Sequence, residues 1–226
     1  SDMAVAVLDV APVGPDYQPG HAHADTLSFE LSLGQQRVIV NSGTSQYGTG
    51  PERNRQRSTA AHNTVILDGQ DSSEVWAGFR VARRARARVH RADTERGRTT
   101  IEASHDGYLR LRGRNEHRRR WILEHDSLLV EDEITGRFTS AEWRGHLHPA
   151  IMARITGPAS VELHAPGGSL ISVVFEGTSR LSLDSCTWHP EFGVSLLNRC
   201  IVAQLTGSTI SSHFHWGRGP VALALA

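Results

Sequence analysis

The sequence contains no lysine, so all 24 basic residues among its 226 are arginine. The 24 acidic residues balance them, and the formal net charge is zero. A chain without net charge has no global field that would attract nucleic acid or an anionic membrane. We interpret the arginine bias as the codon usage of a GC-rich genome. The alternative is recognition of carboxylate or sulfate groups, which the guanidinium fork binds through two hydrogen bonds.

Cysteine and long apolar runs are also scarce. Cys186 and Cys200 are too few for a disulfide framework or a cysteine-rich zinc site, and they could form one disulfide or remain two buried thiols. No apolar run approaches the roughly 20 residues that span a bilayer. The first residues lack the pattern of a signal peptide, and Ser1-Asp2 before Met3 resembles a cloning remnant. We expect the chain to be a fragment of a longer two-domain protein.

What the sequence does contain is a succession of short strands. Residues 27–33 alternate apolar and polar side chains, and a turn then leads into 37–40, which predicts a hairpin. Residues 119–124 and 128–133 predict a second one, and no helical stretch of ten residues is evident. We predict one all-β domain over residues 1–226, a large antiparallel β-sandwich of the supersandwich type. Further strands are predicted at 64–67, 79–90, 99–103, 108–112, 142–148, 160–164, 170–175, 200–205 and 209–215.

Two segments depart from this regular pattern. Residues 41–61 are rich in Gly, Ser, Thr, Asn and Arg, and a loop of this length in a β domain is usually functional or disordered. The run 83–91 alternates Arg with Ala and Val, which predicts an edge strand with one solvated face or a stripe that binds polyanions. Among the five tryptophans, Trp76 follows a polar run and is the best candidate platform for a sugar ring.

The most informative cluster is His21-Ala22-His23-Ala24-Asp25, together with His62 about forty residues later. In an extended segment residues i and i+2 point to the same side, so His21 and His23 could chelate one ion. A turn at Pro19-Gly20 would instead let the two rings diverge. Asp25 could be a ligand or could orient an imidazole, and hydrogen-bonded structural histidines remain the alternative. For the pairs His146/His148 and His213/His215 we favour structural or surface roles.

Four motifs resemble, in order and spacing, the C-terminal domain of the heparinase II/III family. They are residues 14–31, Asn41-Ser42-Gly43-Thr44, residues 57–64, and Ser73-Glu74-Val75-Trp76. The resemblance implies a polysaccharide lyase that cleaves heparin, heparan sulfate or alginate, with an α/α toroid preceding the β-sandwich. The toroid lies outside this chain. Periplasmic location or secretion is also implied.

The resemblance further implies roles for individual residues. His21 matches the catalytic histidine, and His23 and His62 match ligands of a structural zinc ion. Asn41 stands where the family has an aspartate ligand, so the metal loses a full opposing charge there. The site then binds zinc weakly, recruits Asp25 or water, or is empty.

The implied chemistry is β-elimination, in which the uronate carboxylate is neutralised, the C5 proton is removed and the leaving oxygen is protonated. Arg53 and Arg57 could pair with carboxylate or sulfate groups of an acidic polysaccharide. In the family that the chain resembles, a tyrosine and the group facing the carboxylate come largely from the toroid, so we expect this chain alone to be inactive. The alternative is a non-catalytic, metal-stabilised β-sandwich that binds glycans or supports another domain.

Overall fold

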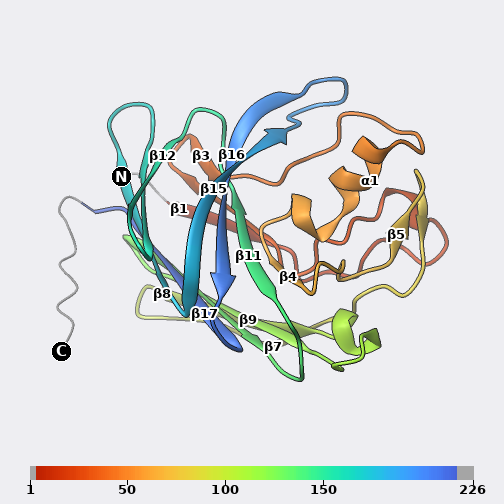
Figure 1. The fold of residues 1–226 in the computed structure, drawn as a ribbon. Coiled ribbons are helices and arrows are strands. Elements are labelled where there is room, and N and C mark those ends of the chain that lie inside the picture. Colours follow the sequence, from red (N-terminus) through yellow and green to blue (C-terminus); the bar gives the residue numbers. More distant parts are fainter. Residues whose placement is uncertain (1–3, 218–226) are drawn as a thin grey trace.

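The structure is a computed structural model that describes residues 4–217, and most of its regular structure is β-strand. Every strand pair within its sheets is antiparallel. Two curved layers pack face to face, and α1 and β5 lie together at one end of them (Figure 1). The predicted all-β sandwich is therefore confirmed. Among these residues no helix is both long and apolar enough to cross a bilayer.

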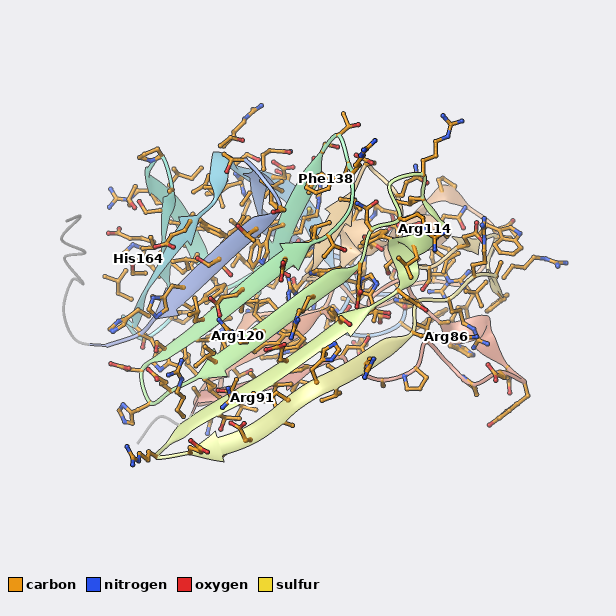
Figure 2. All side chains as sticks on the ribbon, turned by 90° about the horizontal axis from the view of Figure 1, so that it is seen from below. Arg86, Arg91, Arg114, Arg120, Phe138 and His164 are labelled. Atoms are coloured by element: carbon orange, nitrogen blue, oxygen red, sulfur yellow. The ribbon has the colours of Figure 1, made fainter. Side chains whose placement is uncertain are left out.

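The first layer is one sheet of eight strands with β7 at one edge and β12 at the other. Its long strands run side by side in Figure 2, where Arg91 lies on β7 and Arg120 on β9. In spatial order the strands are β12 (Met152–Gly157), β13 (Ser160–His164), β14 (Leu170–Glu176), β17 (Thr209–His215), β10 (Ser127–Ile134), β9 (His117–Leu123), β8 (Arg98–His105) and β7 (Ala87–Glu95).

The second layer combines a four-stranded and a three-stranded sheet. A bridge between Ile39 and Leu147 joins the end of β3 to the chain just beyond β11, so the two sheets continue into each other. The four strands are β15 (Thr178–Trp188), β16 (Leu196–Leu205), β11 (Ala141–His146) and β4 (Val65–Leu67). The three are β1 (Ala4–Leu8), β2 (Phe29–Leu33) and β3 (Gln36–Ile39).

The core lies between the layers and is centred on Trp143 of β11. Its ring is 5.2 Å from that of Phe175, 6.3 Å from that of Phe214 and 6.4 Å from that of Phe29, measured between centroids. These rings come from both layers, so their burial holds the sandwich closed.

A buried ion pair of the first layer lies at the same interface. Arg119 of β9 donates from Nε and Nη2 to the two carboxylate oxygens of Asp132, at 2.7 and 3.0 Å. Its Nη1 donates to the carbonyl oxygens of Leu27 and Asn63, each at 2.7 Å. Because a guanidinium group carries five donors, one side chain can bind a carboxylate and still fasten two segments of the opposite layer. Those segments adjoin the histidine cluster.

Several predicted strands differ from the structure. The hairpins at 27–40 and 119–133 are confirmed as β2–β3 and β9–β10, but the prediction for 108–112 is wrong. There a 3₁₀ helix, η3 (Gly107–Arg110), buries Tyr108, whose hydroxyl donates to the carbonyl of Val65 at 2.8 Å. The prediction for 79–90 is also wrong in part, because the chain leaves β6 (Arg80–Val81) before β7 begins. Strands β12 and β15 were not predicted; β7 is the expected edge strand.

The irregular elements gather around residues 41–61, which hold a helix where we predicted a loop. Helix α1 (Pro51–Arg57) begins with proline at its first turn, and it contains no hydrophobic residue. It packs through buried Arg53, Gln56 and Arg57 instead, which is why hydrophobic periodicity missed it. The remaining elements are η1 (Pro19–His21), η2 (Thr59–Ala61) and the strand β5 (Val75–Trp76) that pairs with β6.

Candidate metal and catalytic site

The two histidines of His21-Ala22-His23 face different surroundings. His21 ends η1 and is exposed, whereas His23 is half-buried and its ring centroid lies 5.2 Å from that of His62. The 3₁₀ turn breaks the extended geometry that would have aligned the two side chains. Of the two arrangements that the sequence allowed, the structure has the divergent one.

His62 is fully buried and carries one nitrogen without a partner. Its Nδ1 lies 3.0 Å from Oδ1 of Asn41, an oxygen that also accepts the backbone N–H of Gly43 at 3.3 Å. Because that oxygen can only accept, Nδ1 of His62 carries the hydrogen and Nε2 presents a lone pair. Within residues 4–217, Nε2 has no hydrogen-bond partner. A buried unpaired acceptor is costly unless something binds it.

Asp25 supplies a carboxylate beside the two imidazoles. His23, Asp25 and His62 offer donor atoms that all lie within 4.8 Å of one another. Burial raises the pKa of Asp25, and it raises that of Asp9 to about 6, with the Asp25 charge as the second cause for Asp9. The residue that we gave as an alternative ligand therefore lies with the histidines, and Asn41 is the hydrogen-bond partner of His62.

The electrostatics keep both imidazoles neutral. Burial lowers the pKa of His62 to about 3, and burial followed by His62 and nearby arginines lowers that of His23 to about 2. A metal ligand must offer an unprotonated nitrogen, and both imidazoles do so here. Two neutral imidazoles, of which His62 offers its orphaned Nε2, and one carboxylate fit a borderline cation such as Zn²⁺.

Arg53 lies against this donor set. Its Nη1 is 3.2 Å from Nε2 of His23 and 3.2 Å from Oγ1 of Thr44, and its Nε donates to the carbonyl of Gly78 at 3.3 Å. The guanidinium also lies over the ring of Tyr47, 5.3 Å from its centroid. In this structure Arg53 therefore donates a hydrogen bond to the lone pair on Nε2 of His23.

Arg57 lies four residues further along α1, on the same side of the helix. Its Nε donates to the carbonyl of Ala22 at 3.0 Å, and its Nη1 donates to those of Ala77 and Trp76 at 2.9 and 3.3 Å. We expected Arg53 and Arg57 to face a carboxylate of the substrate. The structure instead buries both and turns their donors onto backbone carbonyls and onto His23, because the helix has no apolar face to bury.

Sequence reasoning missed the aromatic side chains around His21. The hydroxyl of Tyr47 lies 3.2 Å from Nδ1 of His21, and the two ring centroids are 5.4 Å apart. The ring of Tyr47 also packs against Phe79 at 5.3 Å and Phe192 at 5.0 Å, and all three are among the exposed large hydrophobic residues. The position of Tyr47 in the polar segment 41–61 was the available signal.

Trp76 and the other histidine pairs lie elsewhere. Trp76 is half-exposed and lines a cavity of about 500 Å³ together with Glu74, Arg83 and Arg110. The rings of His213 and His215 lie 6.5 Å apart on β17. The ring of His148 meets that of Trp188 edge to face, with centroids 4.8 Å apart, whereas His146 is buried beside Cys186 and Cys200.

Comparison with known proteins places this chain in a family. The family model for "Heparinase II/III-like, C-terminal" matches residues 1–215. Heparan sulfate lyase HepC from Pedobacter heparinus superposes with a TM-score of 0.77 at 19% identity, and the match covers 98% of this chain and 34% of that one. A heparinase III superposes with a TM-score of 0.77 at 15% identity, over 96% of this chain and 33% of the other.

The chain thus spans about a third of the length of these structures, and identities this low show a shared fold only. Comparison with curated protein sequences returned no match. The family model, by contrast, covers nearly all of the chain, including the histidine cluster. The protein therefore belongs to the heparinase II/III-like C-terminal domain family.

Proposed function

We propose that this chain supplies one wall of the active site of a polysaccharide lyase that cleaves uronic-acid-containing glycans by β-elimination. The observation that carries the proposal is that His21 and His23 face different surroundings. One imidazole is exposed and held by Tyr47, while the next turns inward to a set of metal-binding donors. An N-terminal toroid domain would form the opposite wall, with an acidic glycan between them.

In this proposal His21 acts on the substrate. With hydrogen on Nδ1, the imidazole donates to the Tyr47 oxygen and leaves its Nε2 lone pair free to remove a proton. With hydrogen on Nε2, the tyrosine hydroxyl donates to Nδ1 and Nε2–H can stabilise developing negative charge. The contact with Tyr47 orients the ring in either tautomer.

The buried residues have a supporting role. His23, His62 and Asp25 would hold a zinc ion, with Asn41 orienting His62 through its Nδ1 hydrogen. Such an ion supplies a fixed positive charge that ties the histidine segments together. Arg53 and Arg57 serve as positioning residues, since they join α1 to the segment around His23 and to the β5–β6 turn.

Substrate contacts are assigned to the exposed rings. Tyr47, Phe79 and Phe192 form an apolar surface beside His21, of the kind on which a sugar ring can pack. Trp76 is a second, separate platform. Because polymeric uronic acids occur outside the cytoplasm, the proposal includes periplasmic location or secretion.

The test incubates the full-length enzyme, with its toroid domain, with a panel of polyuronates. The absorbance of the unsaturated uronate product measures the rate. His21→Ala should reduce kcat by about 10²–10⁴-fold, the usual contribution of one acid–base group. Zinc content and melting temperature should stay at wild-type values, and His125→Ala, an exposed histidine, is the control.

Two results would count against the proposal. Full activity of His21→Ala would remove His21 from the chemistry. Robust turnover by this chain alone would show that no second wall is needed. If His21→Ala fails to fold, the non-catalytic alternative is favoured, in which the β-sandwich uses its histidines only to bind a stabilising metal.

A further inference from the structure

A second cluster of metal-binding side chains lies in the four-stranded sheet. His146 on β11, Cys186 on β15 and Cys200 on β16 offer donor atoms that lie within 4.8 Å of one another. Strand register explains their convergence. Cys200 pairs directly with His146 on one side and with Asp184 on the other, and Cys186 is two residues beyond Asp184. Residues in register and residues two apart share a face, so all three side chains point to the same side of the sheet.

His146 is prepared as a ligand by its hydrogen bond. Its Nε2 lies 3.0 Å from the carbonyl oxygen of Ala60, which can only accept, so Nε2 carries the hydrogen. The lone pair is therefore on Nδ1, which is buried and without a hydrogen-bond partner in the described part of the chain. Metal-bound histidines almost always donate their other N–H to a carbonyl or carboxylate in this way.

The geometry does not favour a disulfide. Both thiols are free within residues 4–217. Cys186 pairs in register with Asn198, so it is diagonal to Cys200, and diagonal residues in an antiparallel pair lie roughly 7–8 Å apart at Cα. Cysteines more than about 7 Å apart at Cα cannot be bridged without backbone movement. In a tetrahedral zinc site, with Zn–S bonds of about 2.3 Å, the two sulfurs are about 3.8 Å apart, so a bound cation suits a diagonal pair.

The surroundings also include a cation. Arg144, which lines the same cavity as Cys186 and is paired with Glu142 at 2.9 Å, would partly offset the charge of the two thiolates that a bound metal requires.

The cluster is accessible from solvent. A cavity of about 530 Å³ is lined by His146, Cys186, Arg144, Glu52 and Ser185, among other residues. Water or a small ligand can therefore reach a cation held there and occupy its fourth position. Three protein ligands with one open position are a common arrangement for zinc.

We propose that His146, Cys186 and Cys200 form a second metal site, for a borderline or soft cation, with Zn²⁺ as the first choice. The site is separate from the His23–Asp25–His62 donors, which include no sulfur. The two sites adjoin along the chain, because Ala60, whose carbonyl accepts from His146, lies two residues before His62. The proposal does not depend on the lyase function.

The experiment is a Co²⁺ titration of the reduced, metal-free chain, monitored by absorption. A thiolate-to-cobalt charge-transfer band reports only a sulfur-containing site, so cobalt at His23 and His62 is silent in it. We expect the band to saturate within two equivalents of cobalt, because the His23 and His62 donors can take up a silent one, and Zn²⁺ to abolish it. His146→Gln should weaken cobalt binding at least about tenfold, Cys186→Ser should reduce the band, and His62→Gln should retain it.

Each contrary result overturns the proposal. A reduced wild-type chain with no charge-transfer band in excess cobalt has no such site, whatever the variants do. An undiminished band in Cys186→Ser, checked for folding by circular dichroism, would remove that ligand. The third result is a disulfide in a preparation made without reductant. Its mass would be lower than that of the reduced chain by two hydrogens, and it would show no thiol after unfolding in chelator.

Discussion

Nδ1 of His62 lies 3.0 Å from Oδ1 of Asn41, while Nε2 of the same buried ring has no partner among residues 4–217. One side of the imidazole is thus held and the other side is available. The amide of Asn41 is neutral. A carboxylate that accepted the Nδ1 hydrogen would raise the basicity of Nε2, the nitrogen that would bind the metal.

Asn41→Asp should therefore tighten zinc binding by the purified chain about tenfold or more, the range seen when an orienting partner of a ligand changes. Competition with a chromogenic chelator measures the affinity. Asn54→Asp adds the same charge at an exposed position of α1 and is the control. An equal gain in both variants would mean that net charge alone is responsible.

Tyr47→Phe should lower kcat/KM of the full-length enzyme about 5–10-fold, since it removes one hydrogen bond to His21 worth about 1 kcal/mol. Initial rates of unsaturated product formation measure the change. Tyr17→Phe, at a side chain that is 88% exposed, should have no effect. Unchanged kcat/KM in Tyr47→Phe would show that the hydroxyl does not orient the imidazole.

In the presence of chelator, the free energy of unfolding of the chain should decrease as the pH falls from 6.5 towards 3. Burial lowers the pKa of His62 from 6.5 to about 3, so the unfolded chain takes up a proton that the folded chain excludes. The stability from this group is fully present above pH 6.5 and declines below it. His62→Gln should reduce the slope of unfolding free energy by about 1.4 kcal/mol per pH unit in that window.

Urea unfolding at several pH values measures that slope. His125→Gln, which alters an exposed histidine, should leave the slope in place. A His62→Gln variant with the wild-type slope would show that His62 takes up its proton equally in both states.

Arg119→Met should destabilise the fold by about 3–5 kcal/mol, because it leaves the buried carboxylate of Asp132 without its cation. Arg120→Met removes the neighbouring, solvent-exposed pair with Glu131 and should cost less than about 1 kcal/mol. Urea unfolding of the two variants provides the comparison. Equal losses would mean that burial of the Arg119–Asp132 pair confers no special stability.

Local patterns predicted the fold well where strands are partly buried and turns are short. The hairpins on either side of Gly34 and His125 follow from alternation and turn residues alone. Strands β12 and β15 were missed because both lie at sheet edges, where exposed polar residues weaken the apolar alternation. Helix α1 was missed because its buried side is Arg53, Gln56 and Arg57 rather than an apolar stripe.

The sequence by itself determined the all-β class and the residues that could carry chemistry, because side-chain alternation and turn formation depend on near neighbours. Tertiary structure decided how those residues are used. It turned His21 outward and His23 inward, buried Arg53 and Arg57, and brought His146 to two cysteines on neighbouring strands. Alternation indicates which face of a strand a residue occupies, but strand order and register, which arise from long-range packing, determine what it meets there.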